Sequence, residues 1–130
     1  MPLLEKEIRD FLVSNVSSVE NSFTKVGMMD SVTQSASGAR SGDLTAVSLY
    51  SNGGESENIL RIRIMTRGDK FSTAMDLAND IYDCLQRLID TDTPTYKLYY
   101  VTGERPQQTG RDQSGGFLTS ADYMVRFETL

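Results

Sequence analysis

The chain has 130 residues, a net charge of −5 and no histidine. The length suits one domain spanning residues 1–130, which can bury a core without a disulfide or a structural metal. The lack of histidine excludes the catalytic triads that use it and removes the commonest zinc ligand, so we expect no enzymatic activity and no cofactor. Cys84 is the only cysteine, and we expect a half-buried thiol there and not a nucleophile.

The first segment predicts a short amphipathic helix, because its apolar side chains share one helical face and its acids lie off that face. The segment lacks the apolar run of a signal peptide, and no stretch of the chain reaches the length of a membrane span. We therefore expect the chain to be cytosolic when it is made. The apolar residues of the helix are Leu4, Ile8, Phe11 and Leu12, and its acids are Glu5, Glu7 and Asp10.

The next part of the chain predicts an edge strand, a long loop and a hairpin. Residues 23–29 have weak strand character, which Gly27 interrupts. Residues 30–43 are dominated by small and polar side chains and are expected to form a mobile loop. Strands at 44–50 and 58–67 flank a glycine-rich turn, so we expect them to pair with each other.

A two-faced strand and a two-faced helix follow. In the strand at 58–67, apolar residues alternate with Arg61 and Arg63, so the apolar and guanidinium groups project from opposite faces. The helix is expected to span residues 71–90, with an apolar stripe on one side and Asp69 as the cap of its first turn.

The last part of the chain predicts two more strands, at 96–101 and 122–128, on either side of a glycine-rich loop at 102–117. The elements together predict an α+β fold with a single mixed or antiparallel sheet of four to five strands and two helices.

Three aspartates of the predicted helix, Asp76, Asp80 and Asp83, are spaced to lie together on its polar side. They could hold Mg²⁺, which would suit a small magnesium-dependent nuclease, or they could form an ordinary solvated face. A further alternative is intermolecular, because acids on one subunit can meet arginines on another.

The arginines offer a matching set of alternatives. Arg61 and Arg63, with Lys97 and Arg126 beside them, could form a basic patch that contacts phosphate in a nucleic-acid-binding module or acids in a subunit interface. The net negative charge argues against general nucleic-acid binding. An exposed sheet face also carries such charges without any specific role.

In the glycine-rich loop, the side chains of Arg105, Arg111 and Asp112 are candidates for recognition, since loops held by a rigid sheet often bind partners. The tripeptide of residues 67–69 matches an integrin-type motif, but a strand-to-helix junction explains its glycine and a helix cap its aspartate.

The second half of the chain contains, in order, the strand ILRIRIMTRG, the helix DKFSTAMDLANDIYDCLQRL, the strand YKLYYVTGERP, the loop GRDQSGG and the strand SADYMVRFET. This order resembles the tail terminator proteins of long-tailed bacteriophages, which are also catalogued as minor capsid proteins. The specific part of the resemblance covers residues 58–128. Its clearest signatures are Ala74 and Ala78 in a helix that ends in IYDCL, and the loop of Gly110, Arg111 and Asp112 before a strand that ends in VRFE.

The resemblance implies a sheet with both helices packed on one face, in subunits that form a hexameric ring at the head-proximal end of the tail tube. Such a ring ends tube polymerisation and provides a surface for head joining. The implied partners are further copies of the chain, the tail tube protein and head–tail connector proteins, with DNA only in passage through the lumen and no membrane. The alternative is another neck component, such as a head completion or stopper protein. The expected subunit or tube contacts are Arg61, Arg63, Asp76, Asp80, Asp83, Arg105, Arg111, Asp112 and Arg126.

Overall fold

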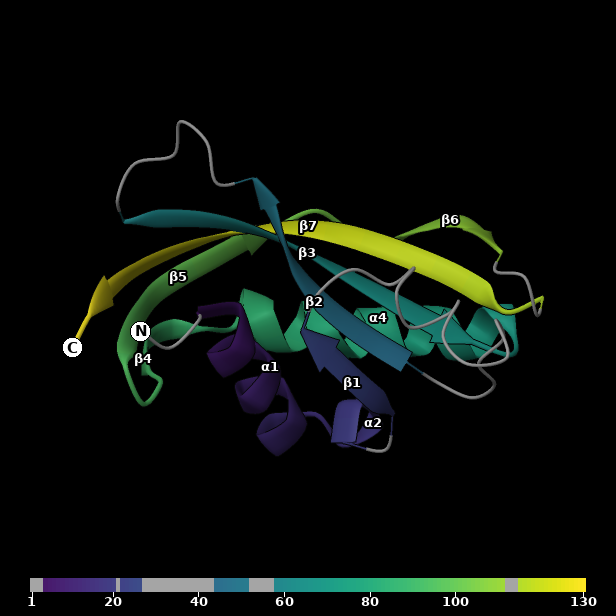
Figure 1. The fold of residues 1–130 in the computed structure, drawn as a ribbon, viewed down its shortest axis with the longest axis horizontal. Coiled ribbons are helices and arrows are strands. Elements are labelled where there is room, and N and C mark those ends of the chain that lie inside the picture. Colours follow the sequence, from purple (N-terminus) through teal and green to yellow (C-terminus); the bar gives the residue numbers. More distant parts are fainter. Residues whose placement is uncertain (1–3, 21, 27–43, 52–57, 112–114) are drawn as a thin grey trace.

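The computed structural model describes residues 4–20, 22–26, 44–51, 58–111 and 115–130 (Figure 1). The predicted mobile loop at 30–43 and the turn at 52–54 lie outside the described residues. The elements follow in the order α1 (Leu4–Asn15), α2 (Ser17–Glu20), β1 (Phe23–Val26), β2 (Leu44–Ser51), β3 (Ile59–Gly68), α4 (Phe71–Gln86), β4 (Ile89–Asp92), β5 (Tyr96–Gly103), β6 (Gln107–Arg111) and β7 (Phe117–Thr129).

The strands form one sheet in the order β1-β2-β3-β7-β5-β4. The long strand β7 has β3 along one edge, and β5 followed by β6 along the other. All the pairs are antiparallel except β1 with β2, which are parallel. The predicted α+β class and single sheet are therefore confirmed, as is the antiparallel pairing of β2 with β3.

The predicted counts of four to five strands and two helices are wrong, because the described residues form seven strands and three helices. Helix α2 has four residues, which is too short to show helical periodicity in the sequence. The strands β4 and β6 have the polar sequences IDTD and QQTGR, which carry little of the usual strand pattern. Backbone pairing with β5 and β7 holds these two strands, and residue types alone do not reveal that pairing.

The apolar stripe predicted that helix α4 ends near Asp90, but the helix ends at Gln86. Ile89 fits the stripe in sequence, yet its side chain is 71% exposed. Asp90 has a φ of 46°, which lies outside the right-handed helical region. The chain leaves the helix here, because residues 89–92 pair with β5 as a short strand.

The three helices lie on one side of the sheet, as Figure 1 shows. The core between the layers is apolar and includes Ile62 and Ile64 of β3, Ile81 and Leu85 of α4, and Leu12 of α1, all of them buried. Burial of each such side chain stabilises the fold by roughly 1.5–3 kcal/mol. The other sheet face, which we name the open face, is covered by no helix in the described part of the chain.

Candidate functional site

The open face carries the arginines that the sequence singled out. Arg61 and Arg63 of β3 lie opposite Met124 and Asp122 of β7, so these side chains project from the same face, as does Arg126. Arg63 is already neutralised, because its Nε and Nη2 donate hydrogen bonds to the two carboxylate oxygens of Asp122 at 2.8 and 3.3 Å. Arg61 is exposed and lines a shallow groove of about 490 Å³ beside Met124.

Farther along the open face, cations alternate with acids. Lys97 lies opposite Glu128 in the pairing of β5 with β7, and Arg126 lies opposite Tyr100. The hydroxyl of Tyr99 donates a hydrogen bond to Glu128 at 2.7 Å, which raises the pKa of Tyr99. The predicted basic patch is therefore interrupted by carboxylates, and the open face is of mixed charge.

The acids of α4 lie on the exposed side of the helix layer, as predicted. Asp80 and Asp83 line a groove of about 600 Å³ between α1 and α4, whereas Asp76 lies outside it. We name this hollow the helix groove. Its other lining residues include the guanidinium of Arg87, the thiol of Cys84 and the apolar side chains of Phe11, Val16 and Leu88.

The three aspartates do not converge on a metal site. Among the residues that the structure describes, no group of three or more histidine, cysteine, aspartate or glutamate side chains could hold a metal ion. Asp80 accepts a hydrogen bond from the hydroxyl of Ser18 in α2 at 2.8 Å. Cys84 is half-buried, as predicted, and burial raises the pKa of its thiol although Arg87 acts in the opposite direction. The arrangement of these aspartates therefore does not support the alternative of a magnesium-dependent nuclease.

An aromatic and cationic cluster lies at the end of the sheet where α4 begins. The rings of Phe71 and Phe117 meet edge to face, with centroids 6.1 Å apart and an interplanar angle of 80°. The guanidinium carbon of Arg111 lies 4.4 Å from the centre of the Phe117 ring. The same guanidinium donates hydrogen bonds to the carbonyl oxygen of Gly115 at 2.8 and 3.2 Å. We name Phe71, Arg111 and Phe117 the aromatic knob, and Phe71 remains 44% exposed within it.

The other loop residues that the sequence singled out lie elsewhere. The guanidinium of Arg105 lies over the ring of Tyr82 in α4, 5.0 Å from its centre. Arg105 and Arg111 therefore pack on different aromatic rings and do not form one recognition cluster. Asp112 lies outside the described residues.

The tripeptide of residues 67–69 is not displayed as a ligand, because Arg67 is only 1% exposed. Its Nη1 forms an ion pair with Asp69 at 2.8 Å. The prediction that Asp69 caps α4 is wrong, since Lys70 occupies the cap position and makes no cap hydrogen bond through its side chain. A Cβ on Gly116 would lie 2.4 Å from Cζ of Arg67, so the guanidinium packs directly against this backbone.

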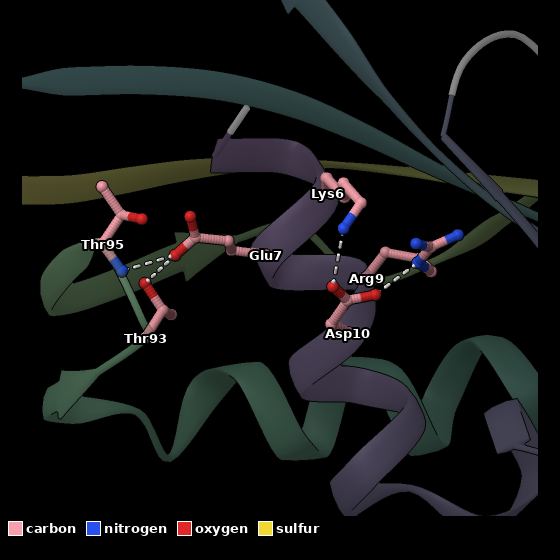
Figure 2. Close-up of polar contacts among 6 residues, drawn as sticks. All are labelled: Lys6, Glu7, Arg9, Asp10, Thr93 and Thr95. Carbon is pink, nitrogen blue, oxygen red and sulfur yellow. Dashed lines mark hydrogen bonds and ion pairs between the residues drawn. The ribbon is translucent and has the colours of Figure 1, made fainter. Parts of the chain in front are cut away.

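A buried carboxylate in α1 has no signal in the sequence. Figure 2 shows Glu7 pointing toward the turn between β4 and β5, where one of its oxygens accepts hydrogen bonds from the hydroxyl of Thr93 at 2.6 Å and the amide of Thr95 at 2.9 Å. Burial raises the pKa of Glu7, but these hydrogen bonds outweigh it and leave the pKa below its ordinary value of 4.5. Glu5 and Glu7 lie off the main apolar face, yet both are buried. The partners stand 86 or more positions apart in the sequence, so no local spacing could have revealed this contact.

Comparisons with known proteins add no family to these observations. No protein-family model matches the chain, and a search of curated proteins found no match. In the part of the chain that the structure describes, no helix combines the length and the apolar character needed to cross a membrane.

Proposed function

We propose that the protein is a structural component of a phage virion that forms a hexameric ring at the head-proximal end of the tail tube. There the ring ends polymerisation of the tube and provides the surface to which the head joins. The proposal is supported by the resemblance of residues 58–128 to tail terminator proteins. The observation that carries it is the presence, on one small domain, of a groove with two aspartates and, separately, of the exposed guanidinium of Arg111 beside an aromatic cluster.

Surfaces of opposite sign suit a ring. A ring closes through head-to-tail contacts, in which each subunit uses two different complementary patches. Charge complementarity between such patches guides the encounter and fixes the register of the contact. Acids that face the lumen would let DNA pass without sticking, because like charges oppose the counterion release that drives DNA binding. The ring would assemble in the host cytoplasm and remain in the virion, with the tail tube protein and head–tail connector proteins as its neighbours.

Negative-stain microscopy of the purified protein mixed with tail tubes tests this proposal directly. We expect a ring at one end of each tube and tubes that stop growing once they are capped. Light scattering should give the mass of a hexamer at high protein concentration or in the presence of tubes. A protein that stays monomeric under all these conditions and never joins a tube would contradict the proposal.

A different neck component, such as a head completion or stopper protein, is the alternative. It would share the same mixed-charge surfaces but would bind on the portal side of the junction. Deletion of the gene distinguishes the two functions. Loss of a terminator should leave overlong or headless tails, whereas loss of a head completion protein should leave normal tails beside unstable filled heads.

A further inference from the structure

We propose that copies of this chain associate by docking the aromatic knob of one copy, formed by Phe71, Arg111 and Phe117, into the helix groove of the next. The inference rests on the proposed function, because it names the contact that would join neighbouring subunits of the ring. It also replaces the pairing of helix acids with open-face arginines that the sequence alone suggested.

The knob has the features of a rigid binding group. Phe71 leaves 44% of its surface exposed, so much of this ring adds nothing to the core of its own subunit. The guanidinium of Arg111 is held by stacking on Phe117 and by its two hydrogen bonds to Gly115. A side chain that is already ordered loses less entropy when a partner binds. Aromatic residues and arginine are also the types most enriched among residues that dominate binding energy.

The helix groove complements the knob in charge and in polarity. Asp80 and Asp83 supply two carboxylates against the single guanidinium of Arg87, so the groove keeps an acidic balance. Its apolar lining comes from Phe11 and from the largely buried Val16 and Leu88. A volume of about 600 Å³ is ample for an aromatic ring together with a guanidinium group. Arg111 is exposed, and the contacts of its guanidinium are the carbonyl of Gly115 and the ring of Phe117, so it presents a positive charge to the acids of a second copy.

The placement of the two surfaces makes the contact intermolecular. Phe71 begins α4, whereas Asp83 and Cys84 lie near its end. At 1.5 Å of rise per residue, the knob and the groove are separated by about 20 Å along the same helix. They cannot meet within one subunit, and a contact between them is head-to-tail, the type that closes into a ring or continues as an open filament.

The other arginines fit this role less well. Arg63 is paired with Asp122 in its own subunit, and Arg105 packs on its own Tyr82. Neither stands beside an exposed aromatic ring that could enter an apolar groove. Arg111 combines a fixed guanidinium, stacked on Phe117, with the exposed outer ring of Phe71.

Charge reversal on both sides of the contact tests the inference. In Arg111→Glu the knob carries a negative charge toward Asp83, and in Asp83→Arg the groove repels Arg111. Each variant alone should need at least a tenfold higher protein concentration for half-assembly, measured by analytical ultracentrifugation. An equimolar mixture of the two should assemble again, because alternating subunits then place the introduced glutamate against the introduced arginine and the native arginine against the native aspartate.

Asp76→Arg is the matched control, since Asp76 is an exposed acid on the same helix but lies outside the groove. It should assemble like the parent protein. Phe71→Ser tests the apolar half of the contact. It should weaken assembly of the otherwise unchanged protein, and it should also weaken the rescued mixture when it is added to both charge-reversal variants. Circular dichroism verifies that each variant is folded, which is expected because Arg111 and Asp83 are exposed.

The single cysteine gives an independent measurement. Cys84 lines the helix groove, so its reaction with a maleimide should slow at least tenfold when the protein assembles. If rings form but both charge reversals assemble normally and Cys84 reacts at an unchanged rate, the knob-and-groove contact is wrong while the proposed function stands. If the mixture is rescued but no assembly caps a tail tube, the contact is right and the function is wrong. A parent protein that never associates would overturn both.

Discussion

At the scale of single residues, the most consequential contact joins Glu7 to the turn between β4 and β5. Glu7 is 6% exposed, and burial of a charge is costly unless hydrogen bonds compensate for it. The hydroxyl of Thr93 and the amide of Thr95 provide that compensation, and they tie helix α1 to a turn in the last third of the chain. This polar contact therefore adds a directional anchor to a helix that otherwise packs through its apolar face.

The substitution Glu7→Gln should lower the free energy of unfolding at neutral pH by about 1–3 kcal/mol, because it removes the charge from two hydrogen bonds. The pKa of Glu7 is lower in the folded protein than the ordinary value of 4.5. The unfolded chain therefore binds the proton more readily, and the stability that Glu7 contributes is present above pH 4.5 and is lost as the pH falls through the folded-state pKa. Urea unfolding of both proteins at neutral pH and below pH 4.5 should show the difference shrinking in acid.

Asp10 provides the control for this experiment. It pairs with Lys6 and Arg9 on the surface of α1 (Figure 2), and its side chain is 50% exposed. Exposed ion pairs contribute little, so Asp10→Asn should change the free energy of unfolding by less than about 1 kcal/mol. Equal losses for Glu7→Gln and Asp10→Asn would mean that the buried hydrogen bonds do not anchor the helix.

A second prediction concerns Gly103, which lies opposite Tyr123 in the pairing of β5 with β7. A Cβ at this position would lie 2.3 Å from Cδ1 of Tyr123, and that ring is 2% exposed and packed against Tyr82. Since the ring has little room to move, Gly103→Ala should lower the free energy of unfolding by about 1–3 kcal/mol. Thr102→Ala, one residue away and exposed, should change it by less than about 0.5 kcal/mol in the same chemical denaturation experiment. Identical unfolding curves for the two variants would refute this account.

At the scale of elements, the sequence predicted the helices and strands whose apolar residues recur with a regular period. The alternation in β3 and the stripe in α4 are long enough to show their period, and the burial of Ile62, Ile64, Ile81 and Leu85 follows it. Two predictions at the ends of α4 were wrong, because a single residue decides where a helix begins or ends. Ile89 continues the stripe but pairs in a strand, and Asp69 has the type of a cap but binds Arg67.

The sequence predicted the charged residues of the candidate site but not their contacts. The acids of α4 and the arginines of β3 are visible in the sequence, but their partners are not, since Asp122 reaches Arg63 from another strand. The aromatic knob joins residues from three elements, α4, β6 and β7, and no local sequence pattern predicts such a cluster. Contacts between distant segments depend on strand register, which residue types leave open.

The N-terminal end of α4 offers a third prediction. Lys70 has φ −123° and ψ 151°, the extended backbone of an ordinary cap, but its side chain makes no cap hydrogen bond. Serine in this conformation can accept a hydrogen bond from a free amide of the first turn, so Lys70→Ser should raise the free energy of unfolding by about 1 kcal/mol. Thermal or urea unfolding measures the gain. Lys70→Ala should give no comparable gain, and equal stabilisation by both variants would point to removal of the lysine charge as the cause.

At the scale of the whole molecule, the net charge of −5 is unevenly distributed. Asp80 and Asp83 lie together in the helix groove, in the second half of α4. Arg111 of β6 lies by the opposite, N-terminal end of that helix, beside Phe117 and Phe71. The open face carries charges of both signs. Two copies with the same net charge repel each other at long range, so association requires that opposite local charges meet in the right orientation. The proposed head-to-tail contact satisfies this requirement.

The fourth prediction follows from this balance of charges. Raising the salt from about 0.1 M to about 1 M shortens the screening length from about 10 Å to about 3 Å. If attraction between Arg111 and the groove acids guides the encounter, assembly followed by light scattering should slow by roughly tenfold at high salt. Formed assemblies should persist, because burial of Phe71 against the apolar lining is insensitive to screening. Arg111→Gln should assemble slowly at both salt concentrations, whereas faster assembly of the parent protein at high salt would mean that net repulsion, and not local attraction, controls the encounter.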